Sequence, residues 1–140
     1  MNYPFQTARL RVRDFTPDDR DAFHDMLSNP NVMRHIKGTL NREESDHELI
    51  RFICRHEDPN DFVHVWAIES EADDCIGLCG VYDNGKGENE LAYRLRERYW
   101  GQGYGKEIAG ALIDHCLDVL KVDKLTAYVR AANTGSVRIL

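Results

Sequence analysis

The sequence has no long apolar run, and this absence argues against a membrane-spanning protein. The longest apolar stretch runs from Phe62 to Ile68 and is interrupted by His64, far short of the roughly 18 consecutive apolar residues that a membrane span needs. The first residues, MNYPFQ, lack the basic start and the apolar run of a secretory signal peptide. We therefore expect a cytoplasmic protein with no membrane partner.

The sequence also lacks an excess of positive charge. Its 18 lysines and arginines are outnumbered by 24 aspartates and glutamates, which gives a net charge of −6 at pH 7. This balance disfavours binding to nucleic acid, because that partner is itself negatively charged. Four basic residues nevertheless gather in one stretch, at Arg94, Arg96, Arg98 and Lys106. They fit either a solvated strand end or a site for one anionic ligand.

Cysteines are few, and none of the four forms a CxxC pair. A strand across Cys75 and Cys79 would place both side chains on one face, because side chains alternate along a strand. The histidines show no regular spacing to these cysteines, so we expect no metal site. Free, buried thiols in a reducing compartment are the better interpretation.

The chain length of 140 residues indicates a single domain spanning residues 1–140. Alternating and helical spacings of apolar residues predict the order β-α-α-β-β-β-α-β-α. The expected strands cover 7–15, 62–69, 75–82, 88–96 and 124–130, and the expected helices begin at Thr16, cover 41–56 and 103–121, and begin again near Thr134. This order predicts an α/β (α+β) fold, with a mixed, mostly antiparallel sheet and helices on both faces.

The most informative stretch is a glycine-rich turn, Tyr99-Trp100-Gly101-Gln102-Gly103-Tyr104-Gly105, at the start of an amphipathic helix. Glycines permit sharp turns and close approach of a ligand to the backbone, and a helix start offers unpaired N–H groups. Together they predict an anion site suited to a pyrophosphate. The dinucleotide fingerprint G-x-G-x-x-G fails here, because Lys106 or Ile108 takes the last position.

Four ordered motifs make the sequence resemble the GNAT acetyltransferase superfamily, in its RimJ/RimL-like branch. They are Thr7-Ala8-Arg9-Leu10-Arg11-Val12-Arg13, Glu90-Leu91-Ala92-Tyr93, the glycine-rich turn at 99–105, and Asn133-Thr134-Gly135-Ser136. The broad superfamily has Gln or Arg where this chain has Trp100, a position at which the Rim-like branch commonly has Trp.

The resemblance implies direct transfer of the acetyl group of acetyl-CoA, as co-substrate, to an acceptor amine. It assigns coenzyme binding to Leu95, Arg96, Gln102, Gly103, Tyr104, Gly105, Lys106 and Asn133. Glu90 is the expected base, acting directly or through a water, with Glu88 as runner-up and a solvated strand carboxylate as the alternative. Ser136 would donate a hydrogen bond to the leaving thiolate; its alternative role is a first-turn serine.

The acceptor stays open between a protein N-terminus, such as that of a ribosomal protein, and a small-molecule amine. An alternative function is a GNAT-like module that binds CoA or a protein partner without turnover.

The resemblance also implies that the chain ends early, because family members continue into closing C-terminal strands. Without those strands, the strand expected over 124–130 would be an unprotected edge, and we expect a homodimer through it.

Overall fold

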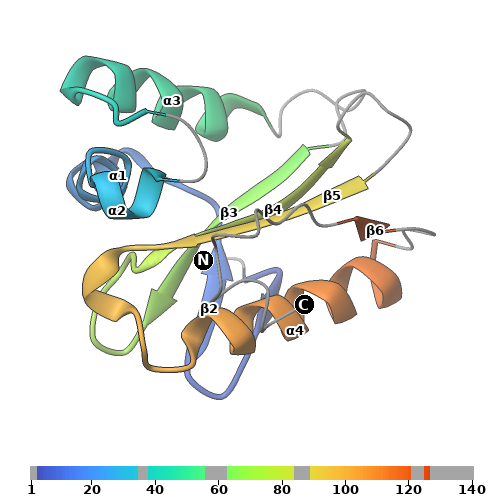
Figure 1. The fold of residues 1–140 in the computed structure, drawn as a ribbon. Helices are drawn as coiled ribbons and strands as arrows, with labels where there is room; N and C mark the ends of the chain where they lie inside the picture. The colour runs from blue at the N-terminus through green and yellow to red at the C-terminus, as the bar shows by residue number, and fades with distance from the viewer. Residues whose placement is uncertain (1–2, 35–37, 56–62, 84–88, 121–124, 127–140) are drawn as a thin grey trace.

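The computed structural model describes residues 3–34, 38–55, 63–83, 89–120 and 125–126. Six strands of these residues form one sheet in the order β1-β2-β3-β4-β5-β6, and Figure 1 shows its arrangement. The strands are β1 (Phe5–Gln6), β2 (Leu10–Arg13), β3 (Val63–Ser70), β4 (Gly77–Asp83), β5 (Asn89–Leu95) and β6 (Leu125–Thr126). All neighbours are antiparallel except β5 and β6, which are parallel. The prediction of a mixed, mostly antiparallel sheet is confirmed.

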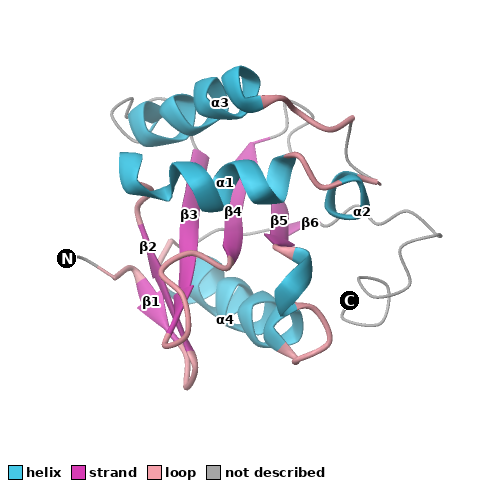
Figure 2. Cartoon of the chain, turned by 90° about the vertical axis from the view of Figure 1, so that its left-hand side faces the viewer, coloured by secondary structure: helices cyan, strands magenta, loops and turns pink. Residues whose placement is uncertain are grey.

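Helices cover both faces of this sheet, as the sequence predicts. They are α1 (Arg20–Leu27), α2 (Pro30–Met33), α3 (Arg42–Arg55) and α4 (Tyr104–Asp118), with short 3-10 helices η1 (Pro17–Asp19) and η2 (Glu97–Tyr99). Figures 1 and 2 show α1, α2 and α3 on one side of the sheet and α4 on the other. The described helices and strands therefore form three layers.

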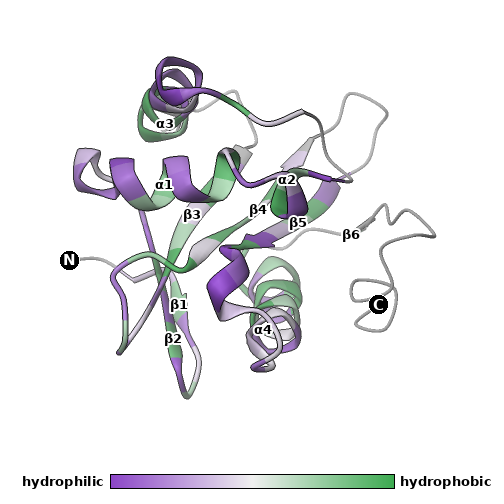
Figure 3. Ribbon diagram, turned by 60° about the vertical axis from the view of Figure 1, so that its left-hand side comes forward, coloured by the Kyte–Doolittle hydropathy of each residue, from purple (hydrophilic) through white to green (hydrophobic). Residues whose placement is uncertain are grey.

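Two hydrophobic clusters fill the space between these layers. One lies between the sheet and α4 and includes Val12, Val81 and Leu112. The other lies under α1 and α3 and includes Phe23 and Leu78. Hydrophobic stretches run along β3, β4 and α4 (Figure 3), as expected for strands whose two faces are both covered.

The first helix begins where the sequence predicts it, at Thr16 and Pro17. The Thr16 N–H donates to the Asp19 carboxylate at 2.9 Å, and Pro17 occupies a position where a helix needs no N–H donor. Asn29 and Pro30 end this helix, as expected, but they also start α2, because the Asn29 side chain accepts from the Asn31 N–H at 2.8 Å. The residue types that end one helix can also cap the start of the next one.

The N-terminal strand is shorter than expected, and β1 was not predicted at all. The expected strand over 7–15 is confirmed only for Leu10–Arg13, while Phe5 and Gln6 form a two-residue strand that is too short for periodicity to show.

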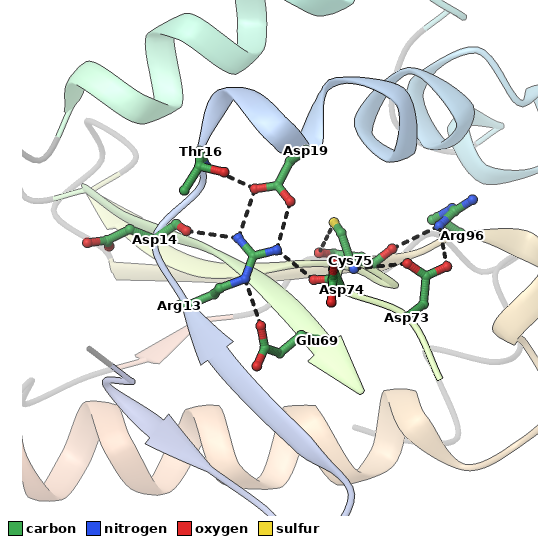
Figure 4. Close-up of polar contacts among 10 residues, drawn as sticks. Arg13, Asp14, Thr16, Asp19, Glu69, Asp73, Asp74, Cys75 and Arg96 are labelled. Carbon is green, nitrogen blue, oxygen red and sulfur yellow. Dashed lines mark hydrogen bonds and ion pairs between the residues drawn. The ribbon is translucent and has the colours of Figure 1, made fainter. Parts of the chain in front are cut away.

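Arg13, at the end of β2, is buried among acidic partners (Figure 4). Its guanidinium donates to both Asp19 oxygens at 2.7 and 2.8 Å and to Glu69 at 2.9 Å. A buried charge requires such partners, because water no longer solvates it. The alternating pattern of the sequence did not reveal them, since they come from residues 6 and 56 positions away.

The expectation for the cysteines is wrong on two counts. Cys75 precedes β4 and packs in the cluster under α1 and α3, whereas Cys79 packs in the cluster under α4, so the two do not share a face. Cys54 is exposed, whereas Cys116 is buried like the other two. Burial raises the pKa of the Cys75 thiol to about 12 and that of Cys116 to about 11, so both stay protonated at neutral pH.

Part of the expected C-terminal structure lies outside the described residues. Of the strand expected over 124–130, the structure describes Leu125–Thr126, and the helix expected to start near Thr134 is not described.

Candidate functional site

The glycine-rich turn links the end of β5 to the start of α4. Gly101 has φ 77° and Gly103 has φ 81°, values that residues with a Cβ rarely adopt. Gly103, which has no side chain, is the N-terminal cap residue of α4, and no side chain among the described residues caps this end by a hydrogen bond. The helix's first backbone bond runs from the Glu107 N–H to the Gly103 carbonyl at 3.1 Å. The N–H groups just before Glu107 therefore have no acceptor within the helix.

The N-terminal segment contacts this turn through Arg9, which the sequence-based site did not include. The Arg9 Nη1 donates to the Gln102 carbonyl at 3.0 Å, and its Nε donates to Glu107 at 2.7 Å. The guanidinium also lies over the Tyr104 ring, 4.4 Å from its centroid. The only sequence signal for Arg9 was its place in the motif that begins at Thr7.

The edge of β5 that faces β6 leads into this turn. The Arg96 N–H donates to the Ile76 carbonyl, on the β4 side, at 2.9 Å. Main-chain groups alternate between the two edges of a strand, so those of Leu95 point to the β6 side. The Leu95 carbonyl there accepts from the Trp100 indole at 3.0 Å. The described part of β6 pairs in parallel with Asn89 and Glu90.

The side chain of Arg96 forms contacts on the side of β5 that faces β4. Its guanidinium donates to Asp25 at 2.8 Å, to Asp73 at 3.0 Å and to the Cys75 carbonyl at 2.9 Å. The Tyr99 hydroxyl donates to the same Asp73 carboxylate at 2.5 Å. Burial acts to raise the pKa of Asp73, but these hydrogen bonds outweigh it and hold the pKa below its usual value. Figure 4 shows Arg96 directed toward Asp73, so its side chain joins the turn between β3 and β4 to the start of η2.

Glu90 lies on the face of β5 that is turned toward α1, α2 and α3. Leu95 belongs to the cluster under α4, and Leu91 and Tyr93 pack against that cluster, so Glu90 and Arg94 point to the opposite face. Tyr82 of β4 is the cross-strand neighbour of Glu90. Burial and the nearby Glu90 carboxylate raise the pKa of Tyr82.

Arg94 adds a positive charge to the same face of the sheet. Burial lowers its pKa to about 10, an effect that Glu48 of α3 and Tyr82 partly oppose. Its Nη1 contacts the Met33 sulfur at 3.7 Å. The face therefore combines a carboxylate, a phenol and a guanidinium.

Some expected site residues cannot be placed. Asn133 and Ser136 lie outside the described residues, as does Glu88. The structure brings Gln102, Gly103, Tyr104, Gly105 and Lys106 together in the turn and first helical turn. Within the described part of the chain, no group of three or more His, Cys, Asp or Glu side chains is arranged to hold a metal ion. None of the described helices is both long and apolar enough to cross a membrane.

Comparison with known proteins defines the class. The family described as "Acetyltransferase (GNAT) domain" matches residues 9–140. The chain therefore belongs to the GNAT acetyltransferases, a family of acetyl-CoA-dependent N-acetyltransferases.

Individual relatives agree with this class. The chain is 28% identical to an uncharacterized N-acetyltransferase, p20, of Bacillus licheniformis, over 96% of this chain and 77% of that protein. It is similar to the crystal structure of an acetyltransferase from Agrobacterium tumefaciens, with a TM-score of 0.80, 25% identity and coverage of 99% and 80%. It shares its fold with RimL, a ribosomal L7/L12 alpha-N-protein acetyltransferase solved with coenzyme A, with a TM-score of 0.80, 16% identity and coverage of 99% and 80%.

Proposed function

We propose that this protein binds acetyl-CoA at the glycine-rich turn and transfers its acetyl group directly to a primary amine. The observation that carries the proposal is the start of α4, where a glycine is the cap residue and two glycines have positive φ, in a chain of the GNAT family. Backbone N–H groups at a helix start bind phosphate because the helix dipole is positive there. The diphosphate of the coenzyme would contact the amides from Gln102 to Lys106.

The pantetheine arm would follow the edge of β5 that faces β6. The Leu95 main chain points to this edge, and the Trp100 indole, by binding the Leu95 carbonyl, joins the strand end to the turn. Arg96 contributes indirectly, because the hydrogen bond from its guanidinium to Asp73 helps to position the same strand end. Asn133 is proposed as a further contact to the arm.

The chemistry needs an amine that has lost its proton, because an ammonium has no lone pair to attack with. Glu90 would accept this proton, directly or through a water, and its cross-strand neighbour Tyr82 lies beside it on β4. The amine nitrogen then bonds to the thioester carbonyl carbon as the carbon–sulfur bond breaks. The nitrogen loses its second proton as the departing CoA thiolate gains one, and Ser136 would donate a hydrogen bond to that thiolate.

The acceptor is a primary amine, either a protein N-terminus or a small-molecule amine. The similarity to RimL supports a ribosomal protein N-terminus as one candidate, although at 16% identity that similarity shows only the fold. A panel of amines, including N-terminal peptides and polyamines, would identify the acceptor through release of free CoA thiol.

Two measurements test the proposal. Isothermal titration calorimetry should show acetyl-CoA binding, and a thiol-release assay should show turnover with at least one amine of the panel. Binding without thiol release across the panel would favour a module that binds CoA without catalysis. Absence of binding would overturn the proposed function.

A further inference from the structure

The segment from Thr7 to Arg9 holds both carboxylate oxygens of Glu107, a residue in the first turns of α4. The Thr7 hydroxyl donates to Oε2, and the Arg9 main-chain N–H donates to the same oxygen at 3.2 Å. The Arg9 Nε donates to Oε1 at 2.7 Å. Burial acts to raise the pKa of Glu107, but these contacts hold it below its usual value, so the carboxylate is charged. A negative side chain is thus held beside the amides proposed to bind a diphosphate.

A free carboxylate at this position would interfere with coenzyme binding. Acidic side chains near a helix start are attracted by the positive end of the dipole, and they cap the unpaired N–H groups of the first turn. Such a carboxylate would compete with the coenzyme for those amides and would repel its phosphates. Among the described residues no side chain caps the start of α4, and Glu107 is turned to the N-terminal segment instead.

Arg9 also sets the direction of the peptide group between Gln102 and Gly103. Its Nη1 binds the Gln102 carbonyl at 3.0 Å. Because C=O and N–H point in opposite directions in a trans peptide, the Gly103 N–H must point away from Arg9. Glycines on both sides of Gln102 would otherwise let this peptide group rotate easily. The Arg9 side chain is 45% exposed, and its stacking on Tyr104 keeps it against the turn.

We propose that Arg9, supported by Thr7, is a positioning residue for the coenzyme. It sequesters the Glu107 carboxylate, so the first amides of α4 stay available for phosphate, and it orients the peptide group that opens the turn. The inference rests on the proposed acetyl-CoA site, and its test separates the two.

The test is a cycle of three variants measured by calorimetry with acetyl-CoA. Arg9→Met should weaken binding about tenfold, the effect of one charge released at a helix start. Glu107→Gln should bind equally well or more tightly, because it removes the negative charge and leaves Arg9 in place. Arg9→Met combined with Glu107→Gln should recover most of the affinity that Arg9→Met loses. At saturating acetyl-CoA, kcat of Arg9→Met should stay within about twofold of the original, so that the change appears in KM.

Arg20→Met is the matched control, because Arg20 forms an exposed ion pair with Asp46, between α1 and α3. It should leave the affinity for acetyl-CoA unchanged. If Arg9→Met fails to fold, as judged by thermal unfolding, Thr7→Val replaces it in the same cycle, since it removes only the hydroxyl donor to Glu107.

The outcomes distinguish the inference from the function on which it rests. If the original protein does not bind acetyl-CoA, the proposed function is wrong. If it binds and Arg9→Met binds equally well, the positioning role is wrong. If Arg9→Met binds weakly and Glu107→Gln does not restore the affinity, Arg9 acts by direct contact or by general stability, and the sequestration of Glu107 is refuted.

Discussion

Gly103 shows at the scale of a single residue how the backbone prepares the turn. Its φ of 81° lies in the left-handed region, and a Cβ built on it would lie 3.4 Å from the Arg9 Nη2. A side chain at this position would strain the backbone and would contact the guanidinium that binds the neighbouring peptide group. The turn therefore depends on the absence of a side chain here.

Gly103→Val should abolish detectable acetyl-CoA binding. A β-branched residue at this φ costs roughly 1–2 kcal/mol or more in backbone strain, and it would also occupy space beside the proposed phosphate position. Calorimetry checks the loss, and retained affinity would refute the placement of the diphosphate. Gly110→Ala is the control, because a Cβ at Gly110, in the middle of α4, meets no atom within 4 Å. It should raise stability by about 0.5–1 kcal/mol and leave binding unchanged.

Glu90→Gln should lower turnover much more than affinity for acetyl-CoA. The amide keeps the shape of the side chain but cannot accept the proton of the amine, so kcat should fall about 10²–10⁴-fold. Steady-state kinetics with the best amine of the panel gives kcat, and calorimetry gives the affinity. Glu43→Gln, an exposed change on α3, controls for loss of charge alone. Unchanged turnover in Glu90→Gln would remove Glu90 from the mechanism.

At the scale of elements, buried ion pairs join parts of the chain that lie far apart in sequence. Arg13 links β2 to η1 through Asp19 and to β3 through Glu69. It also donates to the Asp74 carbonyl, in the turn where the neighbouring Asp73 receives Arg96 (Figure 4). These contacts connect the N-terminal strand to the segment that leads into the glycine-rich turn.

Arg13→Met should destabilise the protein by about 3–5 kcal/mol, because it leaves Asp19 as a buried carboxylate without its cation and leaves Glu69 with Arg11 alone. Urea unfolding followed by circular dichroism measures the change. Arg20→Met should change stability far less than Arg13→Met, since its ion pair with Asp46 is exposed. Equal effects of the two substitutions would contradict the structural role of the buried pair.

At the scale of the whole molecule, an aromatic cluster joins β1, β3 and α4. His115 stacks on Phe5 with ring centroids 4.8 Å apart and meets Trp66 edge-on at 5.6 Å, while His64 stacks on the other side of the cluster at 5.4 Å from Trp66. Burial lowers the pKa of both histidines, and in His115 the charge of His64 adds to this effect. Protonation of either ring would place a cation in a largely apolar cluster.

Stability should therefore fall with acidification below about pH 6.5. The folded pKa values lie below the ordinary value of 6.5, so the unfolded chain binds protons first. The contribution is complete above pH 6.5 and is lost as the pH falls through the lower folded values. Thermal unfolding between pH 7.5 and about pH 5 measures the effect, and His115→Phe should make the melting temperature less dependent on pH in this range. An unchanged pH dependence in His115→Phe would refute this role.

The arrangement of elements was predictable to a large extent because it depends on local patterns. The glycines at 101 and 103, the capping residues at Thr16 and the apolar stripe of α4 all act through neighbours in sequence, and the structure confirms each of them. The unpredicted features involve long-range contacts. Arg9 reaches Glu107 across 98 positions, and Arg96 reaches Asp25 across 71. The proposed homodimer through the sheet edge stays a prediction.

The sequence by itself determined the family and the turn that begins α4, because a glycine-rich helix start has its conformation and its dipole wherever it lies in a fold. Only the tertiary structure decided which side chains surround that turn. It placed Arg9 on Glu107 and directed Arg96 to Asp73, because the sheet brings β2, the β3–β4 turn and the end of β5 together. No local pattern encodes such neighbours, since they are set by the packing of the whole chain.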